Sequence, residues 1–412
     1  MDEILVEADS PIAFGQRLKI LRTRRGVTRA ALGGLVGRSD SWVKGLETGR
    51  LGIPKLPVLL ALAEVLRVRD LAALTGETSL PVELFVGPGH DRLPAVRAAI
   101  DLFPVPVVTP APTAARLRVR LGQAWAARHA APNHREVIGA LLPDLIQDAQ
   151  AVVRLTDRAE DRRAAQAVLA QVYCLAQFFI AYQPAQDLLW RVVERSMVAA
   201  QESEDPRAIG VAAWLAAQAH RDAGGFDAAD AVTMRTLEFL EPLLPDANAP
   251  TVAAYGALQF EAGYTAARRG ETGASWGYWD SASAVARRLP EDYYDPITSF
   301  GTTIMAAHAV TVAVELRAGG ESARQATAAD AGAIPSRPRR ARHRIEQARA
   351  YHLNAQPDAA VEILAQAHAA APETVRYNGY AKRILLEEVQ ESSPARRRRA
   401  SDLAVKIGLL TA

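Results

Sequence analysis

The sequence predicts an all-α protein with a small N-terminal head and a larger C-terminal body of antiparallel helix pairs. The chain has 412 residues, which is long enough for two or three domains. Hydrophobic residues make up 49% and charged residues 23%, and the alanine-rich composition favours helix in a globular protein. Apolar residues recur at helical spacing, and short segments rich in Gly, Pro, Asp and Asn separate these stretches.

Five short helices are expected between residues 14 and 75. Phe14, Leu18 and Leu21 repeat at helical spacing, which predicts the first helix. Thr28 and Ser39 are expected to cap the second and third helices, because their hydroxyls can accept from the first backbone N–H groups. A fourth helix is expected after two prolines, and a short helical turn near residues 71–74. The first three helices are expected to end at glycines, which are Gly26, Gly37 and Gly49.

This head is strongly basic. Between residues 17 and 70 there are twelve Lys and Arg residues against four Asp and Glu residues, whereas the whole chain has a net charge of only +2. Such a segment suits a polyanionic partner, although a run of charge alone can also be a solvated face.

Residues 77–113 are expected to form a linker between head and body. Gly87-Pro88-Gly89 and the proline-rich segment 103–112 cannot continue a helix, although one small helix can form over 94–102. The proline content predicts a semi-rigid spacer.

From residue 114 onward, a degenerate repeat of helix, tight turn and second helix is visible. The turns lie near residues 224, 270, 319 and 356, at uneven intervals, and an earlier pair fits 169–181 and 184–200. Small residues where paired helices cross are what stacked helical hairpins require. The body is therefore expected to be a solenoid with two ends and a concave face.

The segment from Thr28 to Gly49 resembles the XRE (lambda-repressor-like) helix-turn-helix family. It reads TRAALGGLVGRSDSWVKGLETG, and the apolar segment 54–68 is similar to that family's fourth helix. The body resembles a degenerate tetratricopeptide (TPR) array, so the whole chain is similar to XRE/TPR transcriptional regulators of bacteria. This resemblance implies a DNA-binding regulator, residues 1–76 being the DNA-binding domain and 114–412 serving for dimerisation, effector sensing or both.

The helix beginning after Ser39 is expected to enter the major groove of duplex DNA, with Val43 and Leu46 facing the core. Its other face would present Asp40, Ser41, Trp42, Lys44 and Gly45. The side chains expected at the DNA are Thr28, Arg29, Arg38, Ser39, Asp40, Ser41, Trp42, Lys44 and Arg50. By family position, Arg29, Asp40 and Ser41 are the candidate base readers.

Several residues of the head have two open interpretations. Asp40 can accept from a cytosine amino group or stabilise its helix N-terminus, and Trp42 can meet DNA or pack internally. The resemblance to the XRE family also implies that Glu47 fixes the recognition helix internally. Gly45 replaces a base-contacting side chain of the family, which favours the alternative of a scaffold without sequence specificity. Gly33-Gly34 is expected to mark a close approach of two helices, with a hinge as the alternative.

Other functions find little support in the sequence. The single cysteine, Cys174, cannot form an internal disulfide and is expected to be a small buried residue. We see no metal-ligand spacing, phosphate loop or catalytic triad, and therefore expect no cofactor and no enzymatic activity. An acidic N-terminus and the lack of a long apolar run predict a cytoplasmic, nucleoid-associated protein that does not contact membranes.

The body offers one candidate effector pocket. Trp276, Tyr278 and Trp279 cluster near one repeat, where they either fill the core or line a pocket for a peptide or small-molecule effector. The arginines of segments 337–344 and 396–399 are expected to be solvated helix faces. We expect a homodimer formed through the body, because two heads would pair on half-sites about one DNA turn apart.

Overall fold

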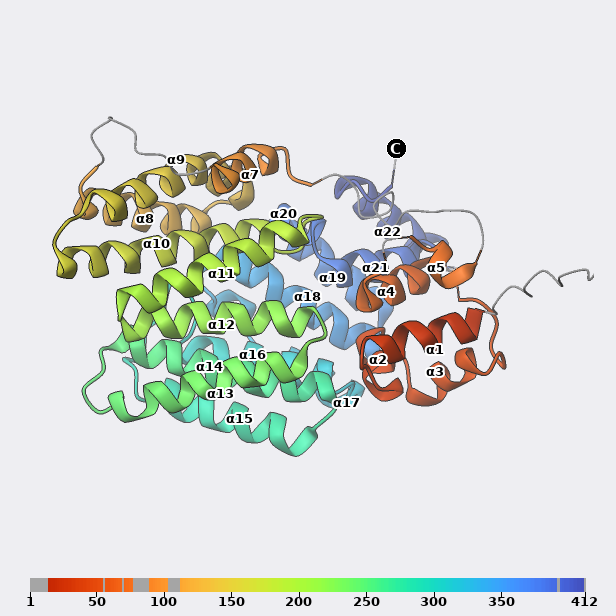
Figure 1. The fold of residues 1–412 in the computed structure, drawn as a ribbon. Helices are drawn as coiled ribbons and strands as arrows, with labels where there is room; N and C mark the ends of the chain where they lie inside the picture. Colours follow the sequence, from red (N-terminus) through yellow and green to blue (C-terminus); the bar gives the residue numbers. More distant parts are fainter. Residues whose placement is uncertain are drawn as a thin grey trace, which may run out of the picture. The chain divides into compact units, whose positions relative to one another are not determined.

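The computed structural model describes residues 14–54, 56–68, 70–76, 89–102, 112–390 and 393–410. The chain divides into two compact units, Met1–Gly87 and Pro88–Ala412, hereafter unit 1 and unit 2 (Figure 1). Across the described residues the regular structure consists of helices, without a β-strand. The all-α prediction is confirmed.

Unit 1 contains five helices in its described part, as expected. They are α1 (Phe14–Arg24), α2 (Arg29–Leu35), α3 (Asp40–Glu47), α4 (Leu56–Leu66) and α5 (Ala72–Thr75). The Thr28 hydroxyl accepts the Ala31 N–H at 3.1 Å, and the Ser39 hydroxyl accepts the Trp42 N–H at 3.1 Å. Both predicted N-caps are confirmed, because each hydroxyl satisfies a backbone donor of a first helical turn.

The turns between the first helices depend on glycine. Gly26, Gly37 and Gly49 have φ values of +66°, +71° and +74°, in the left-handed region that other residues rarely adopt. These turns let the helices pack around one small core. The fully or almost fully buried side chains of that core include Leu18, Leu32, Val43, Leu46 and Leu62.

The first part of unit 2 comes from the segment predicted as a linker. Helix α7 (Leu93–Asp101) is the small helix expected there, but it packs on α9, and Val96 and Ile100 are fully buried in the core of unit 2. Residues 89–102 therefore belong to unit 2. The other parts of the predicted linker, 77–88 and 103–111, lie outside the described residues.

The remainder of unit 2 is a succession of antiparallel helix pairs, as the repeat predicted. The pairs are α8 (Ala114–Ala130) with α9 (His134–Leu155), α10 (Ala159–Ile180) with α11 (Gln186–Ser203), α12 (Pro206–Asp222) with α13 (Phe226–Leu240), α14 (Ala249–Arg269) with α15 (Thr272–Ala286), α16 (Met305–Glu315) with α17 (Gly319–Ala328), and α18 (Arg337–Leu353) with α19 (Pro357–Ala370). The last helices are α20 (Pro372–Arg376), α21 (Gly379–Val389) and α22 (Pro394–Lys406).

The predicted hairpin turns lie where the sequence indicated. Gly224 and Gly270 have positive φ and end α12 and α14. The other two turns use Arg317 and Ala355 at positive φ instead of glycine, immediately before α17 and α19. The sequence therefore located the turns but not the residue that adopts the left-handed conformation in each.

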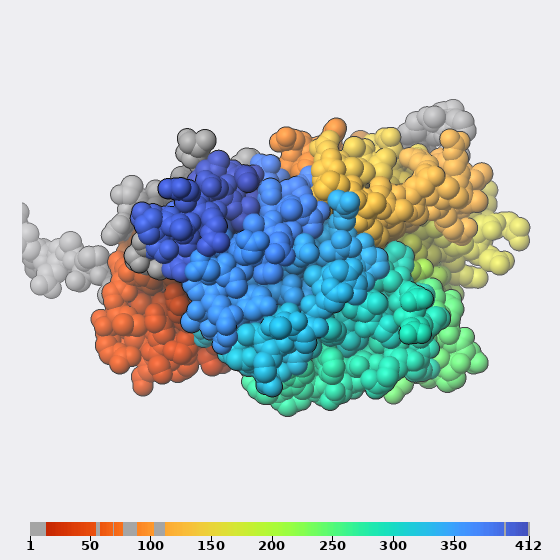
Figure 2. All heavy atoms as spheres, turned by 180° about the vertical axis from the view of Figure 1, so that it is seen from behind, coloured from red at the N-terminus to blue at the C-terminus, as the bar shows by residue number. Residues whose placement is uncertain are grey.

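The first helices of the pairs form an inner row that returns on itself. Each of α8, α10, α12, α14 and α16 packs against the next, and α18 packs against both α16 and α8. The backbone N–H of Arg135, at the start of α9, donates to Glu373 of α20 at 2.5 Å. Figure 2 shows these first and last elements side by side on one face. The expected solenoid has ends that meet, so its inner helix faces surround an interior.

Candidate nucleic-acid interface

Helix α3 has one buried and one exposed face. Val43 and Leu46 are buried in the core of unit 1, whereas Asp40, Ser41 and Lys44 are exposed. Thr28, Ser39, Arg38 and Arg50 are also exposed beside this helix. A short helix with a polar face and a free N-terminal turn has the form of a helix that enters a DNA groove.

Glu47 anchors the C-terminal end of α3. Its side chain is only 1% exposed and accepts from the Nε of Arg22 at 2.5 Å and the Nε of Arg29 at 2.6 Å. Burial alone would raise the pKa of Glu47, but the hydrogen bonds and charges of the two arginines outweigh it and hold that pKa below its usual value. Glu47 is thus ionised and fixes α3 against α1 and α2, as expected.

This anchor changes the interpretation of Arg29. Its side chain is about one-third exposed, but its Nε is engaged with Glu47. The hydrogen bond to Glu47 raises the pKa of Arg29. Arg29 therefore helps to position the recognition helix. Its other guanidinium N–H groups could contact DNA in addition.

Trp42 is half-buried and packs against the core of unit 1. The guanidinium carbon of Arg38 lies 5.9 Å from the centre of the indole ring, within the range of a cation–π contact. Trp42 thus fulfils the packing role left open for it, and it also orients the exposed Arg38.

Gly45 is buried, so its expected place on the exposed face of α3 was wrong. A Cβ atom at Gly45 would lie 2.9 Å from Cδ1 of Leu51, and the Leu51 N–H donates to the Gly45 carbonyl at 2.9 Å. The chain after α3 folds back over this position. A larger residue at this position would have to displace the Leu51 side chain, which is 36% exposed, so close packing favours glycine there but does not require it.

The two adjacent glycines of α2 behave differently. A Cβ at Gly33 would lie 2.8 Å from the Arg38 carbonyl oxygen, so the chain does pass closely here. The neighbour is the turn that precedes α3, rather than the second helix that the sequence led us to expect. At Gly34 a Cβ would meet nothing within 4 Å, so close packing does not explain that glycine.

Comparison with known protein families identifies this unit. Residues 13–74 match the family described as "Helix-turn-helix domain". Unit 1 carries a helix-turn-helix domain. The matched segment covers α1 to α5 almost to the end, and it is a DNA-binding class of domain rather than an enzymatic one. The predicted resemblance of the head is confirmed.

Comparisons of the whole chain are less informative. No curated protein matches the chain in sequence. Among solved structures, it aligns with Bacillus thuringiensis PlcR, whose structure was determined in complex with the peptide PapR7 and DNA, at 13% identity and a TM-score of 0.27. The alignment covers 87% of this chain and 98% of that chain. A likeness of this size supports no inference about this chain.

The three aromatic residues proposed as an effector pocket have structural contacts. Trp276 and Trp279 pack edge to face with ring centres 5.9 Å apart, and both contact the core around α14 and α16. The Trp279 indole N–H donates to the Met305 carbonyl at 3.0 Å, and the Tyr278 hydroxyl lies 3.6 Å from the Met234 sulfur. These contacts correspond to the core-filling interpretation.

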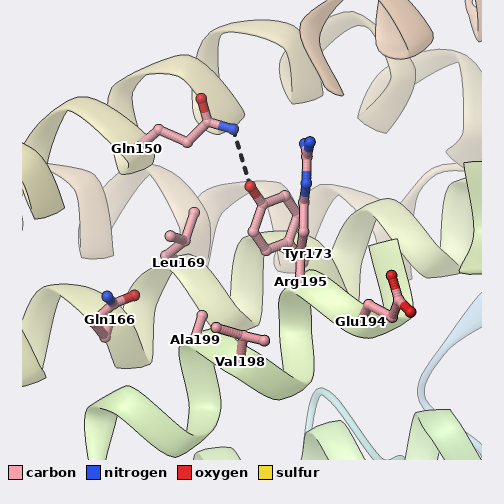
Figure 3. A pocket seen from close by; sticks show the side chains of 8 residues that line it. All are labelled: Gln150, Gln166, Leu169, Tyr173, Glu194, Arg195, Val198 and Ala199. Carbon is pink, nitrogen blue, oxygen red and sulfur yellow. Dashed lines mark hydrogen bonds between the residues drawn. The ribbon is translucent and has the colours of Figure 1, made fainter. Parts of the chain in front are cut away.

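A surface hollow of about 420 Å³ lies elsewhere, between α9, α10 and α11 (Figure 3). The Tyr173 hydroxyl accepts from the Gln150 amide at 2.9 Å inside it. The residues lining it are Gln150, Gln166, Leu169, Tyr173, Glu194, Arg195, Val198 and Ala199. None of these residues stands out in the sequence, because they show no pattern beyond helical spacing.

The interior of unit 2 contains many charged groups that the sequence did not reveal. Arg349 lies 2.7 Å from Glu315 and 2.6 Å from Glu346, and Arg342 lies 2.8 Å from Glu346. Arg221 contacts Glu261, and Arg268 lies 3.5 Å from Glu315. These carboxylates are at most 3% exposed. Each of these four arginines has a carboxylate partner, as buried charges require.

The prediction that segment 337–344 is a solvated basic face was therefore wrong for part of it. Arg342 is only 17% exposed, because α18 is an inner helix that contacts α16 on one side and α8 on the other. The run at 396–399 is likewise partly inward, since Arg396 is 16% exposed and lies 2.7 Å from Glu388.

Two further expectations can be compared with the described residues. Cys174 is buried and its Sγ lies 3.3 Å from the Ser196 hydroxyl, and burial raises the pKa of its thiol to about 12. The prediction that Cys174 is a small buried residue is confirmed. Within the described ranges we find no cluster of three metal-ligating side chains, and none of the helices there has the length and apolar character of a membrane span.

Proposed function

We propose that the protein is a sequence-specific DNA-binding transcription regulator whose α3 reads the major groove. The observation that carries this proposal is the exposure of Asp40, Ser41 and Lys44 on a helix whose other face and C-terminal end are fixed by Val43, Leu46 and Glu47. Rigid placement of a few polar side chains is what base readout needs, since a groove contact requires a defined register.

Different residues would supply different parts of the contact. Ser41, in the first turn of α3, is suited to a base edge, and Asp40 can accept from a cytosine amino group. Lys44, Arg38 and Arg50 are exposed cations that can meet phosphates. Thr28 and Ser39 are exposed helix caps beside them and would contribute hydroxyl contacts to the backbone.

Dimerisation and sensing are proposed for unit 2. Two copies joined through this unit would present two heads to paired half-sites, which raises the effective concentration of the second head. The charged interior of unit 2 supports a sensing role for a peptide or small molecule, because buried polar groups can bind a ligand specifically.

The alternative is an interaction scaffold whose helix-turn-helix has lost sequence specificity. Its main support was Gly45, which was expected to replace a base-reading side chain. Gly45 is buried beneath Leu51, so a glycine at this position also has a packing explanation, and that support is weaker.

Selection of bound fragments from genomic DNA, followed by gel-shift titration of the selected duplexes, tests the proposal. A regulator gives discrete sites that outcompete random duplex by at least about a thousandfold at physiological salt, because specific binding proteins prefer their sites by ~10³–10⁷. A uniform smear with equal affinity for all fragments would support the scaffold instead.

A further inference from the structure

Two inward-facing arginines on neighbouring inner helices of unit 2, one buried and one half-buried, have a buried Nε without an acceptor and no ion-paired carboxylate among the described residues. They are Arg128, at the end of α8, and Arg339, at the start of α18, and these two helices pack together. The guanidinium groups of Arg128 and Arg339 are close enough for each charge to be felt at Tyr294. Arg135 also lacks an ion pair, but its guanidinium donates to the carbonyls of Phe179 and Ala181.

His129 links α8 to the start of α18, because its Nδ1 lies 2.8 Å from the Ser336 hydroxyl. Its Nε2 lies 2.6 Å from the Pro296 carbonyl oxygen.

Arg128 is nine-tenths buried. Its guanidinium carbon lies 4.2 Å from the centre of the Phe178 ring and 5.7 Å from that of Trp125, so aromatic faces cover it. No carboxylate of the described residues comes within 4.0 Å of it, and its Nε has no hydrogen-bond acceptor there. Burial first, and then the charges of Arg135 and Arg339, lower its pKa to about 10.

Arg339 is in a similar position. Its Nη2 lies 3.4 Å from Nδ1 of His308, a neutral acceptor, and its Nε is buried without a partner among the described residues. Glu346 lies close enough to be felt by Arg339 but is bonded to Arg342 and Arg349. Burial lowers the pKa of Arg339.

The neighbouring histidines add no negative charge. Burial and the nearby arginines lower the pKa values of His129 and His343 to about 4. Burial and Arg339 also hold the pKa of His308 well below its usual value. At neutral pH these rings are uncharged. The buried carboxylate of Asp295 also acts on His129, but it lies 3.0 Å from Arg207 and is paired with that residue. The cluster therefore holds two cations in a low-dielectric interior without an ion-paired carboxylate of their own. Such an arrangement is costly unless an anion completes it.

We propose that Arg128 and Arg339 bind the carboxylate of a small organic anion inside unit 2, with Phe178 and Trp125 covering its apolar part. A guanidinium matches a carboxylate with two parallel hydrogen bonds, and the aromatic rings favour an organic group over a hydrated inorganic ion. Two sources share this chemistry, a free organic acid and the C-terminal carboxylate of a short peptide. This site would give the proposed sensing role a ligand class. An effect of that ligand on DNA binding would follow only if the proposed sensing role is correct.

Calorimetric titration of the full chain with defined probes tests the site. The probes are benzoate, its neutral analogue benzamide, and the acetylated tripeptide Ala-Leu-Phe as free acid and as C-terminal amide. We expect saturable binding of benzoate or of the free-acid peptide, and at least tenfold weaker binding of the matched neutral probe. Benzoate binding identifies a free acid as the source, and binding of the peptide acid alone identifies a peptide terminus.

The variants Arg128→Met and Arg339→Met should each weaken that binding at least tenfold, whereas Arg118→Met, an exposed arginine of the same helix α8, should bind like the parent. Arg128→Lys keeps the charge without the two-pronged geometry and should be intermediate. Thermal melts establish that each variant folds. Absence of saturable binding by both acids, or equal binding of acid and neutral probes, would overturn the proposal. Because these titrations contain no DNA, such a failure leaves the proposed DNA-binding function standing.

Discussion

The head and the body bury charge in different ways. In the head, one carboxylate, Glu47, is shared by Arg22 and Arg29, and the charged face of α3 is left to solvent. In the body, whole helices turn arginines inward, and two of these, Arg128 and Arg339, lack a carboxylate among the described residues. The difference teaches that a balanced buried charge fixes a structure, whereas an unbalanced one leaves a place for a ligand.

The largest expected effect is the unfolding of the head alone by a single substitution in its core. Val43→Asp places a charge without a partner in the small core of the head, where Val43 is fully buried, and should unfold the head. The body has its own cores and should keep its melting temperature. Calorimetry should show loss of one transition only. A single transition shifted as a whole would contradict the division into two units.

Helix α7 gives a second test of where the body begins. A fragment of residues 114–412 lacks α7, and with it the contacts of Val96 and Ile100, which are fully buried. At ~1.5–3 kcal/mol for each such side chain, it should be about 3–6 kcal/mol less stable than a fragment of 89–412. Equal midpoints in urea unfolding would show that α7 is not part of the body's core.

Separate fragments of the head and the body address association. We expect 89–412 to be dimeric and 1–87 to be monomeric in light scattering, because dimerisation is proposed for unit 2. A dimeric head or a monomeric body would refute that assignment.

The next largest effect on stability comes from removing one buried charge, either Glu47 in the head or Arg128 in the body. Glu47→Gln leaves Arg22 and Arg29 without their shared anion and should destabilise the head by about 2–4 kcal/mol, somewhat discounted because Arg29 is one-third exposed. Arg128→Met keeps an apolar stem on Phe178 and leaves no partner unpaired, so it should destabilise the body by no more than about 1 kcal/mol or stabilise it. If Arg128→Met costs as much as Glu47→Gln in chemical denaturation, the contrast between the clusters is wrong.

A smaller effect concerns acid stability of the body. The pKa of His343 is about 4 in the folded protein, below the ~6.5 of an unfolded chain. The unfolded state therefore binds the proton first, and this residue lowers stability as the pH falls from about 6.5 to about 4. His343→Leu should reduce the decrease in the body's melting temperature between pH 7 and pH 4.5. An unchanged decrease would mean that His343 does not titrate as described.

How much could be predicted differed between the units for physical reasons. Caps and glycine turns are local features, so the sequence of the head predicted them. The anchoring role of Glu47 joins separate helices and was implied by the resemblance to the XRE family. Gly45 was misplaced because its burial depends on Leu51, in a loop whose path has no periodic pattern. The inward arginines of α18 were missed because their burial depends on contact with α8, about two hundred residues earlier. A basic helix looks solvated until its neighbours are known.

The central claim, that the exposed face of α3 contacts duplex DNA, is tested most directly by comparing two variants of equal charge. Lys44→Ala removes an exposed cation of α3, and Arg24→Ala removes an exposed cation of α1. On a selected duplex, followed by fluorescence anisotropy at several salt concentrations, Lys44→Ala should lose roughly tenfold in affinity, or ~1–3 kcal/mol, and lower the salt slope by about one if it meets a phosphate. Arg24→Ala should stay within about twofold of the parent, since only long-range attraction is lost. Equal losses in the two variants, or none in Lys44→Ala, would contradict the assignment of α3 as the DNA-contacting helix.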